Sequence, residues 1–138
     1  MMYRFDNSHG VCPDGWHIPT DDEWRVLEMS IGLTEAETNI FFNARGVDAG
    51  GKLKAPGEEF WNAPNAGATD EFGFHAVGSG FINIDRNYSS LRIYSPIWTS
   101  TLKEDEPLIR GVAYDHSEIY RGLATGNIVG CAVRCVKD

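Results

Sequence analysis

The sequence lacks long apolar segments and clusters of basic residues. No run approaches the roughly 18 consecutive apolar residues that a membrane-spanning helix needs. The opening residues MMYRFD lack the apolar core of a signal peptide, so we expect no signal sequence in the chain as it stands. Acidic residues outnumber lysine and arginine by 20 to 12, and the longest basic feature is Lys52-Leu-Lys54. The resulting net charge of −8 repels phosphate backbones, which excludes nucleic acid as a partner.

The patterns of common catalytic sites are also missing. The stretch GVDAGG does not match a P-loop, and no Gly-x-Ser-x-Gly elbow is present. Asp115, His116 and Ser117 are neighbours on a predicted turn, where their side chains point in different directions. As a catalytic base, His17 would need a nucleophile or an orienting carboxylate, so a structural role before the first helix explains it better. We therefore expect no catalytic residues and no enzyme activity.

Cysteine is scarce, with one residue near the start of the chain and two near its end. Cys131 and Cys135 form a Cys-x3-Cys pair without a second pair or a nearby histidine, which is a poor zinc site. On one strand these two side chains would lie roughly 13 Å apart, too far for a disulfide. We weigh two alternatives: a Cys12–Cys135 disulfide that closes nearly the whole chain, and three buried reduced thiols. We expect the disulfide, with Cys131 as a buried apolar residue.

The apolar residues that are present predict one α+β domain over residues 1–138. Thr20-Asp-Asp-Glu23 and Thr34-Glu-Ala-Glu37 are capping boxes, and each precedes an apolar stripe with helical spacing. Gly32 and Gly46 are expected to end the two helices, which places both between about residues 21 and 45. Trp16 and Trp24 are interpreted as core residues.

The remainder predicts a long irregular region followed by strands. Residues 47–80 are rich in glycine and asparagine, with short strands expected at 52–54 and 73–77, and with Phe60, Trp61, Phe72 and Phe74 expected to pin the region to the core. Further strands are expected at 80–83, 96–101, 109–114, 118–123 and 130–136, with turns at 115–117 and 125–127. Helices followed by antiparallel strands are typical of the α+β class.

Acidic residues do not form a convincing metal site. Asp21, Asp22 and Glu23 are explained by capping and by the dipole of the first helix, and together with Asp14 they lack the spacing of a calcium loop. The acidic residues of the later loops, at 48, 70, 71 and 85, have no specific spacing either. We therefore expect no metal and no cofactor.

Three motifs carry a resemblance to a known family: CPDGWHIPTDDEW, GATDEFGFHAVGSGFIN, and IWTST followed by GCAVRCVKD. They resemble the Fibrobacter succinogenes major paralogous domain over about Gly10 to Asp138. Members of that family are bacterial extracytoplasmic modules, often found in lipoproteins and surface proteins. Members usually carry more sequence before the Cys-Pro element than residues 1–11 here, so the first strand is short, trimmed, or supplied by residues 3–5.

The same motifs are more distantly similar to the formylglycine-generating, sulfatase-modifying group. WHIPTDDEW is similar to its RLPTEAEWE element and AVRCV to its GFRC tail. This resemblance implies a C-type-lectin-like fold whose two chain ends meet, as a Cys12–Cys135 disulfide would require. The activity of that group depends on two cysteines, and the corresponding stretch LIRGVAYDH has none, so the enzyme is only a minor alternative.

We interpret the chain as a non-enzymatic, extracytoplasmic adhesion module that recognises a glycan or a cell-surface protein. Tyrosine, tryptophan and arginine are enriched in binding surfaces, and they gather in the C-terminal half of the chain. The predicted ligand-binding residues are Tyr94, Tyr114, His116, Tyr120, Arg121 and Asn127, whereas Trp98 is interpreted as core. The alternatives are a variable protein of a diversity-generating retroelement, with its variation over Tyr114–Asn127, and a fimbrial or other surface-assembly subunit.

Overall fold

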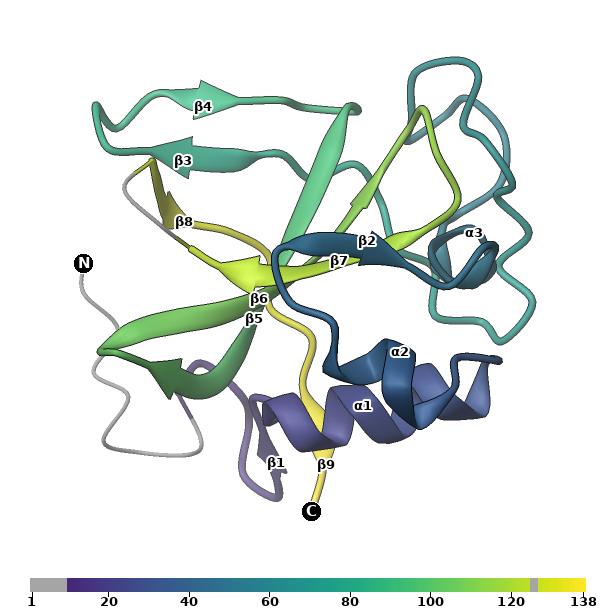
Figure 1. The fold of residues 1–138 in the computed structure, drawn as a ribbon. Coiled ribbons are helices and arrows are strands. Elements are labelled where there is room, and N and C mark those ends of the chain that lie inside the picture. The colour runs from purple at the N-terminus through teal and green to yellow at the C-terminus, as the bar shows by residue number, and fades with distance from the viewer. Residues whose placement is uncertain (1–9, 125–126) are drawn as a thin grey trace.

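A computed structural model of the chain describes residues 10–124 and 127–138. Helices come first along the chain and most strands follow, so the structure has the α+β class predicted from the sequence (Figure 1). The helices are α1 (Asp21–Ser30), α2 (Glu35–Asn39) and α3 (Ala49–Leu53). The strands are β1 (Trp16–His17), β2 (Asn43–Arg45), β3 (Phe81–Asn83), β4 (Tyr88–Ser89), β5 (Tyr94–Lys103), β6 (Glu106–Ala113), β7 (Ile119–Leu123), β8 (Ile128–Gly130) and β9 (Val136–Lys137).

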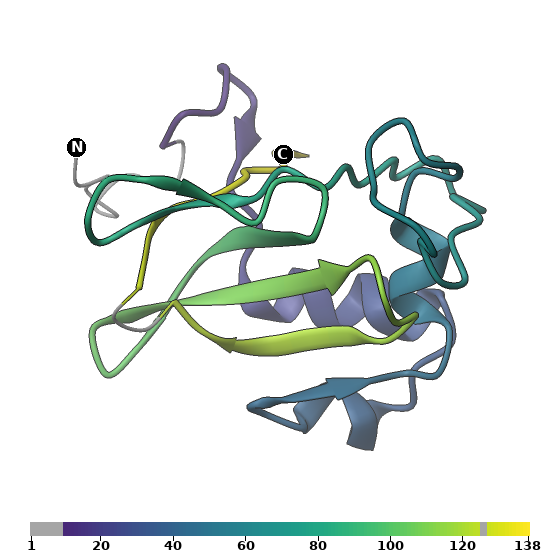
Figure 2. The same cartoon turned by 90° about the horizontal axis from the view of Figure 1, so that it is seen from above.

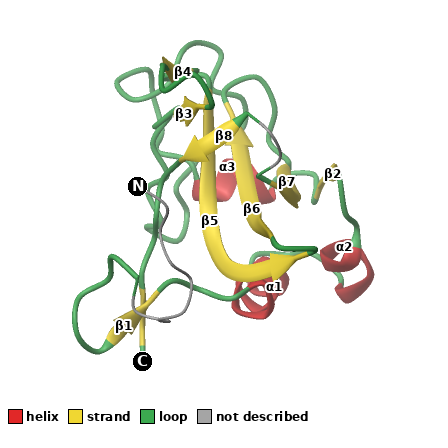
Figure 3. Ribbon diagram, turned by 90° about the vertical axis from the view of Figure 1, so that its left-hand side faces the viewer, coloured by secondary structure: helices red, strands yellow, loops and turns green. Residues whose placement is uncertain are grey.

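The described strands form three antiparallel sheets. The largest has the order β2-β7-β6-β5, the second has the order β4-β3-β8, and β1 pairs with β9. The four-stranded sheet lies between the three-stranded sheet and the helices α1 and α2 (Figure 1). Figure 3 shows the same layers from the side, with β5 and β6 between α1 and β3–β4. The large sheet therefore has two covered faces, one toward α1 and one toward β3.

Both predicted capping boxes are formed. The hydroxyl of Thr20 accepts a hydrogen bond from the backbone N–H of Glu23 at 3.1 Å, and the Glu23 carboxylate accepts the Thr20 N–H at 2.8 Å. Thr34 and Glu37 repeat this exchange at the start of α2. The apolar stripe of α1 then packs Trp24 and Ile31 into the main core, together with Ile97, Val112 and Ile119 from the sheet. Local sequence signals thus determine where α1 begins and which side it buries.

Three local predictions are wrong. The second helix ends at Asn39, and the chain continues as strand β2, which contains Ala44 of the expected helical stripe. The residues around Lys52 form helix α3 rather than a strand. Its glycines are required by close packing, because a Cβ atom at Gly50 would overlap the carbonyl of Glu118. The stretch 73–77 contributes only an isolated bridge, between Ala76 and Lys54.

Aromatic residues and the C-terminal segment also depart in part from expectation. Trp24, Trp61 and Trp98 are buried as predicted, whereas Trp16 is 39% exposed and Phe72 points to solvent from its loop. The expected strand 130–136 is divided into β8, an isolated bridge at Ala132 and β9. The expected strand at 3–5 and the turn residues 125–126 lie outside the described residues.

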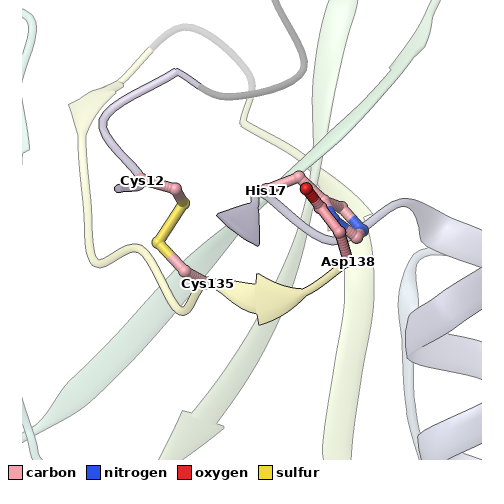
Figure 4. Close-up of a disulfide and its surroundings, with 4 residues drawn as sticks. All are labelled: Cys12, His17, Cys135 and Asp138. Carbon is pink, nitrogen blue, oxygen red and sulfur yellow. A yellow bond between two sulfur atoms is a disulfide. The ribbon is translucent and has the colours of Figure 1, made fainter. Parts of the chain in front are cut away.

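The two ends of the described chain are fastened together, and we call this region the terminal clasp. The predicted disulfide between Cys12 and Cys135 is confirmed, with a Cα–Cα distance of 5.8 Å (Figure 4). Strand β1 pairs with β9 beside it. His17 of β1 contacts the carboxylate of Asp138 through Nδ1 at 2.7 Å and that of Glu23 through Nε2 at 2.8 Å. His17 therefore joins Asp138 to the first turn of α1.

Candidate functional site

Charged side chains buried between α1 and the large sheet form one ion-pair network, the charge cluster. Its members are Asp21 and Glu28 of α1 and three arginines from the sheet, Arg45, Arg110 and Arg121. Glu28 accepts hydrogen bonds from Arg110 and from Arg45, each at 2.6 Å, and no part of its side chain is exposed. Because the carboxylates and guanidiniums are paired with one another and largely closed to solvent, the cluster holds the helix on the sheet.

The charge cluster favours the ionised form of the Asp21 carboxyl group. Burial raises the pKa of the Asp21 carboxyl, but hydrogen bonds from Arg121 and Arg110 outweigh that effect and hold the pKa below its usual value. Burial lowers the pKa of Arg45, against the opposing attraction of Glu28. A carboxylate paired in this way is a structural anion, since a proton acceptor for catalysis needs an accessible lone pair.

Lys54 is a second buried charge, and it also has a structural role. Its ammonium group donates to the carbonyl oxygens of Ala66, Ala113 and His116 at 2.7–2.9 Å. Burial lowers the pKa of Lys54 to about 8, while Asp115 acts in the opposite direction. A neutral amine has only two N–H groups, so all three hydrogen bonds require the protonated form. Lys54 thus pins the long loop region to the end of β6 and has no free lone pair for nucleophilic chemistry.

The predicted ligand-binding residues Tyr94 and Tyr120 share the face of the large sheet that is turned away from α1. Their rings lie against glycines of the sheet: a Cβ atom at Gly111 would overlap the Tyr94 ring and hydroxyl, and one at Gly122 would overlap those of Tyr120. Burial raises the pKa of both phenols. Both are only partly accessible and serve as packing residues of this face.

The other predicted ligand-binding residues lie elsewhere. Arg121 points to the opposite face of β7, where it contacts Asp21 of the charge cluster at 2.6 Å. Tyr114 packs partly against the main core, and His116 is half-buried beside Glu118 at 3.3 Å. Asn127 is exposed before β8. The structure therefore does not bring the six residues into one surface, and their role in ligand binding stays a prediction.

A large concave surface lies instead between the two main sheets, and we call it the intersheet groove. The β3–β4 hairpin and the β5–β6 hairpin project on the same side of the molecule (Figure 2). The groove that they help to enclose has a volume of about 1050 Å³. Its floor and walls include Trp98, Cys131, Phe81, Ile82, Ile84, Tyr88, Ile128 and Val129.

Charged groups stand among the apolar residues of the intersheet groove. Arg86 comes from the turn between β3 and β4, and Asp105 and Glu106 come from the tip of the β5–β6 hairpin. The hairpin is closed by the pair Lys103 and Glu106, so its loop is the two residues Glu104 and Asp105, both with positive φ. Such loops normally contain Asn-Gly, because glycine and asparagine tolerate positive φ best. Glu104 and Asp105 thus place two carboxylates at this tip, although positive φ is unfavourable for both residues.

Two potentially reactive side chains, Cys131 and Tyr88, line the groove. Cys131 is its only cysteine among the described lining residues, and burial raises the pKa of its thiol, which disfavours the nucleophilic thiolate. The Tyr88 hydroxyl donates a hydrogen bond to the carbonyl of Ser79. In the described part of the chain, no group of three or more His, Cys, Asp or Glu side chains is placed to hold a metal ion.

Sequence reasoning missed the groove because its walls come from segments far apart in the chain. Tyr88 and Trp98 belonged to the aromatic C-terminal half that the sequence singled out, but nothing local shows that they face the same space. The charge cluster had a weak signal, since Arg110 interrupts the apolar strand LIRGVA and therefore needs a buried partner.

The arrangement defines a small disulfide-closed α+β domain with a broad groove and a buried ion-pair network. The sequence matches the family described as the Fibrobacter succinogenes major domain over residues 1–137, and the chain belongs to that family. A search of curated proteins and a search of solved structures found no match. None of the described helices is long and apolar enough to cross a membrane. The disulfide indicates an oxidising, extracytoplasmic environment.

Proposed function

We propose that this chain is a non-enzymatic, extracytoplasmic recognition module with a C-type-lectin-like fold, and that the intersheet groove receives its ligand. The joined chain ends, the helices placed before the sheets and the long irregular loops support this fold. A secreted or surface-attached adhesion role is consistent with the disulfide. The observation that carries the proposal is the size of the groove, together with the exposed apolar residues that line it.

The lining of the groove favours a segment of a cell-surface protein as the ligand. Ile84 is 61% exposed, Ile82 is 41% exposed and Val129 is 49% exposed, and all three line the groove. Isolated exposed aliphatic residues are common, but a set that shares one concave surface is typical of protein-binding sites. The acidic hairpin tip next to them would attract a basic side chain of the partner, which agrees with the net charge of −8.

A glycan is the second candidate, and one observation favours it. Tyr88 is 60% exposed in the groove, where Arg86 and Asp105 supply hydrogen-bonding groups. An exposed aromatic face beside charged polar groups can stack on a sugar ring and bind its hydroxyls. The retroelement alternative receives less support, because Ala124 is the only groove-lining residue among the described part of Tyr114–Asn127.

The test is a selection with a displayed peptide library and a glycan array, both run on the same oxidised protein. The groove variant is Ile84→Lys, whose side chain is exposed enough to change without loss of folding. Its matched control is Val47→Lys, because Val47 is 84% exposed and lies outside the groove. Circular dichroism checks the fold of both variants.

We expect peptides with apolar and basic residues to be enriched on the wild-type protein and on Val47→Lys, and to be lost on Ile84→Lys. If the wild type binds a glycan and Ile84→Lys does not, the ligand is a sugar rather than a protein, and the intersheet groove remains the binding site. Binding that Ile84→Lys leaves unchanged, or the absence of binding in both libraries, would overturn the groove as the recognition site. Concentration-dependent self-association of the wild type would favour the surface-assembly alternative.

A further inference from the structure

A second, smaller groove runs between α1 and the C-terminal segment, beside the disulfide, and we call it the clasp groove. Its volume is about 600 Å³, within the range of roughly 300–1000 Å³ that is typical of small-molecule sites. One wall is a stripe of α1 and of the residues just before it, with Glu23, Leu27 and Ser30 at helical spacing. The opposite wall is Arg134, Cys135 and Val136. The clasp groove shares no lining residue with the intersheet groove.

The interior of the clasp groove is apolar and aromatic. Trp24 and Phe74 lie together in it, with their ring centroids 5.7 Å apart. Val26, on α1, lines it and is 63% exposed. An apolar ligand would therefore displace water from apolar surface that the groove already exposes, and the core would not have to rearrange.

Arg134, a cation of the clasp groove, forms no ion pair with the described residues, and its attraction contributes to the lowered pKa of Asp70. The Arg134 guanidinium lies 4.8 Å from the centroid of the Phe74 ring. A guanidinium has five N–H donors in a planar fork, so one that lies over an aromatic ring can still bind a planar anion. The carboxylate in the same groove, that of Glu23, is already occupied by hydrogen bonds with Thr20 and His17.

Within the described part of the chain, the indole N–H of Trp24 is an unpartnered polar group in the wall of the clasp groove. Trp24 is 2% exposed and lines the clasp groove, yet its Nε1 atom has no hydrogen-bond acceptor among the described residues. Buried N–H groups without an acceptor are rare in folded proteins, and each destabilises the free state.

We propose that the clasp groove binds a small amphipathic carboxylate, with its apolar body along α1 and the Trp24–Phe74 pair and its carboxylate on Arg134. The groove disfavours a cationic ligand, because such a ligand would meet Arg134, and the Glu23 carboxylate in the same groove is already hydrogen-bonded to His17 and Thr20. Guanidinium binds carboxylate with two parallel hydrogen bonds, which fixes the orientation of the ligand. Since the chain as a whole is anionic, binding depends on this one arginine.

The test uses decanoate as the probe, with decan-1-ol and decylammonium as matched ligands that differ only in the head group. Binding to the oxidised, isotope-labelled protein is followed by NMR at the indole N–H signal of Trp24, which is assigned with Trp24→Phe. Arg134→Gln removes the charge of the groove and keeps a polar side chain. Arg86→Gln is the matched control, because Arg86 is an exposed arginine of the intersheet groove.

We expect saturable decanoate binding that shifts the Trp24 signal, weakens by about tenfold to a hundredfold in Arg134→Gln, and is unchanged in Arg86→Gln. Decylammonium should bind more weakly than decan-1-ol. Equal decanoate affinity in Arg134→Gln, a stronger affinity for decylammonium, or no saturable shift of the Trp24 signal in the millimolar range would each overturn the proposal. None of these results bears on the intersheet groove, because the two grooves are tested through different residues.

Discussion

Removing the carboxylate of Glu28 should destabilise the protein far more than removing an exposed carboxylate from the same helix. Glu28 lies between Arg45 and Arg110, with one 2.6 Å hydrogen bond to each. In Glu28→Ala, Asp21 would be the one carboxylate left in the charge cluster, and among the described residues it pairs only with Arg110 and Arg121. Arg45 would keep only the carbonyl oxygens of Glu37 and Ile119 as partners.

The expected loss follows from the burial of this pair. Breaking a buried ion pair by removing one partner costs about 3–5 kcal/mol, because the remaining charge stays buried without compensation. Domains of this kind unfold with a free energy of about 5–15 kcal/mol, so the loss is a large part of the total. The matched control is Asp22→Ala, which removes an exposed partner of Arg25 at 3.4 Å and should cost about 0–1 kcal/mol.

Urea-induced unfolding of the oxidised protein, followed by tryptophan fluorescence, measures both variants against the wild type. The double variant Glu28→Met, Arg45→Met should lose less stability than the sum of its single variants, because it removes a buried charge together with its partner. A loss below about 1 kcal/mol in Glu28→Ala would refute the view that the charge cluster holds α1 on the sheet.

Four further predictions concern the cap, the disulfide, the clasp and the hairpin. Thr20→Ala should lower the free energy of unfolding by about 1 kcal/mol, while Thr20→Ser retains it; equal stability of the alanine variant would show that the cap contributes nothing. Thiol titration of the unfolded, unreduced chain should find one thiol, that of Cys131, and reducing the bridge should cost up to about 5 kcal/mol, since it joins residues 123 positions apart; three thiols would exclude the bridge. Hydrogen bonds with Asp138 and Glu23 raise the pKa of His17, so its stabilising effect should be complete below pH 6.5 and be lost as the pH rises through the raised value; a His17→Gln variant with the same pH profile would contradict this. Replacing Glu104-Asp105 by Asn-Gly should raise the midpoint of thermal unfolding by relieving positive φ at two residues, and an unchanged or lower midpoint would show that the turn carries no such cost.

The parts of the fold that could be predicted from the sequence are those set by neighbouring residues. The two capping boxes specify a hydrogen-bond exchange within four residues, and both are formed. The β-rich C-terminal half was also predictable, because its apolar and turn residues alternate along the chain. The Cys12–Cys135 pairing was expected from the positions of the three cysteines, and the family resemblance, which implies that the chain ends meet, agreed with it.

The parts that could not be predicted depend on contacts between distant residues. Ala44 matches a helical stripe, but it lies in strand β2 because β7 offers hydrogen-bond partners at that point. Gly50 and Gly51 disfavour a helix locally, and α3 forms because only glycine allows the carbonyls of Glu118 and Gly67 to come so close. The predicted ligand-binding residues show this most clearly. Neighbouring residues of a strand point to opposite faces of the sheet, so Tyr120 and Arg121 of β7 cannot belong to one surface.

The terminal clasp also determines how the domain would respond to mechanical tension. A pull applied to the chain on either side of the disulfide reaches Cys12 and Cys135 first, and these residues are covalently joined. The load passes through the sulfur–sulfur bond, so the segment between them, with its core and the intersheet groove, lies outside the path of the force. A domain built in this way would keep the intersheet groove intact while it carries load, and only a reducing agent would expose that groove to stretching.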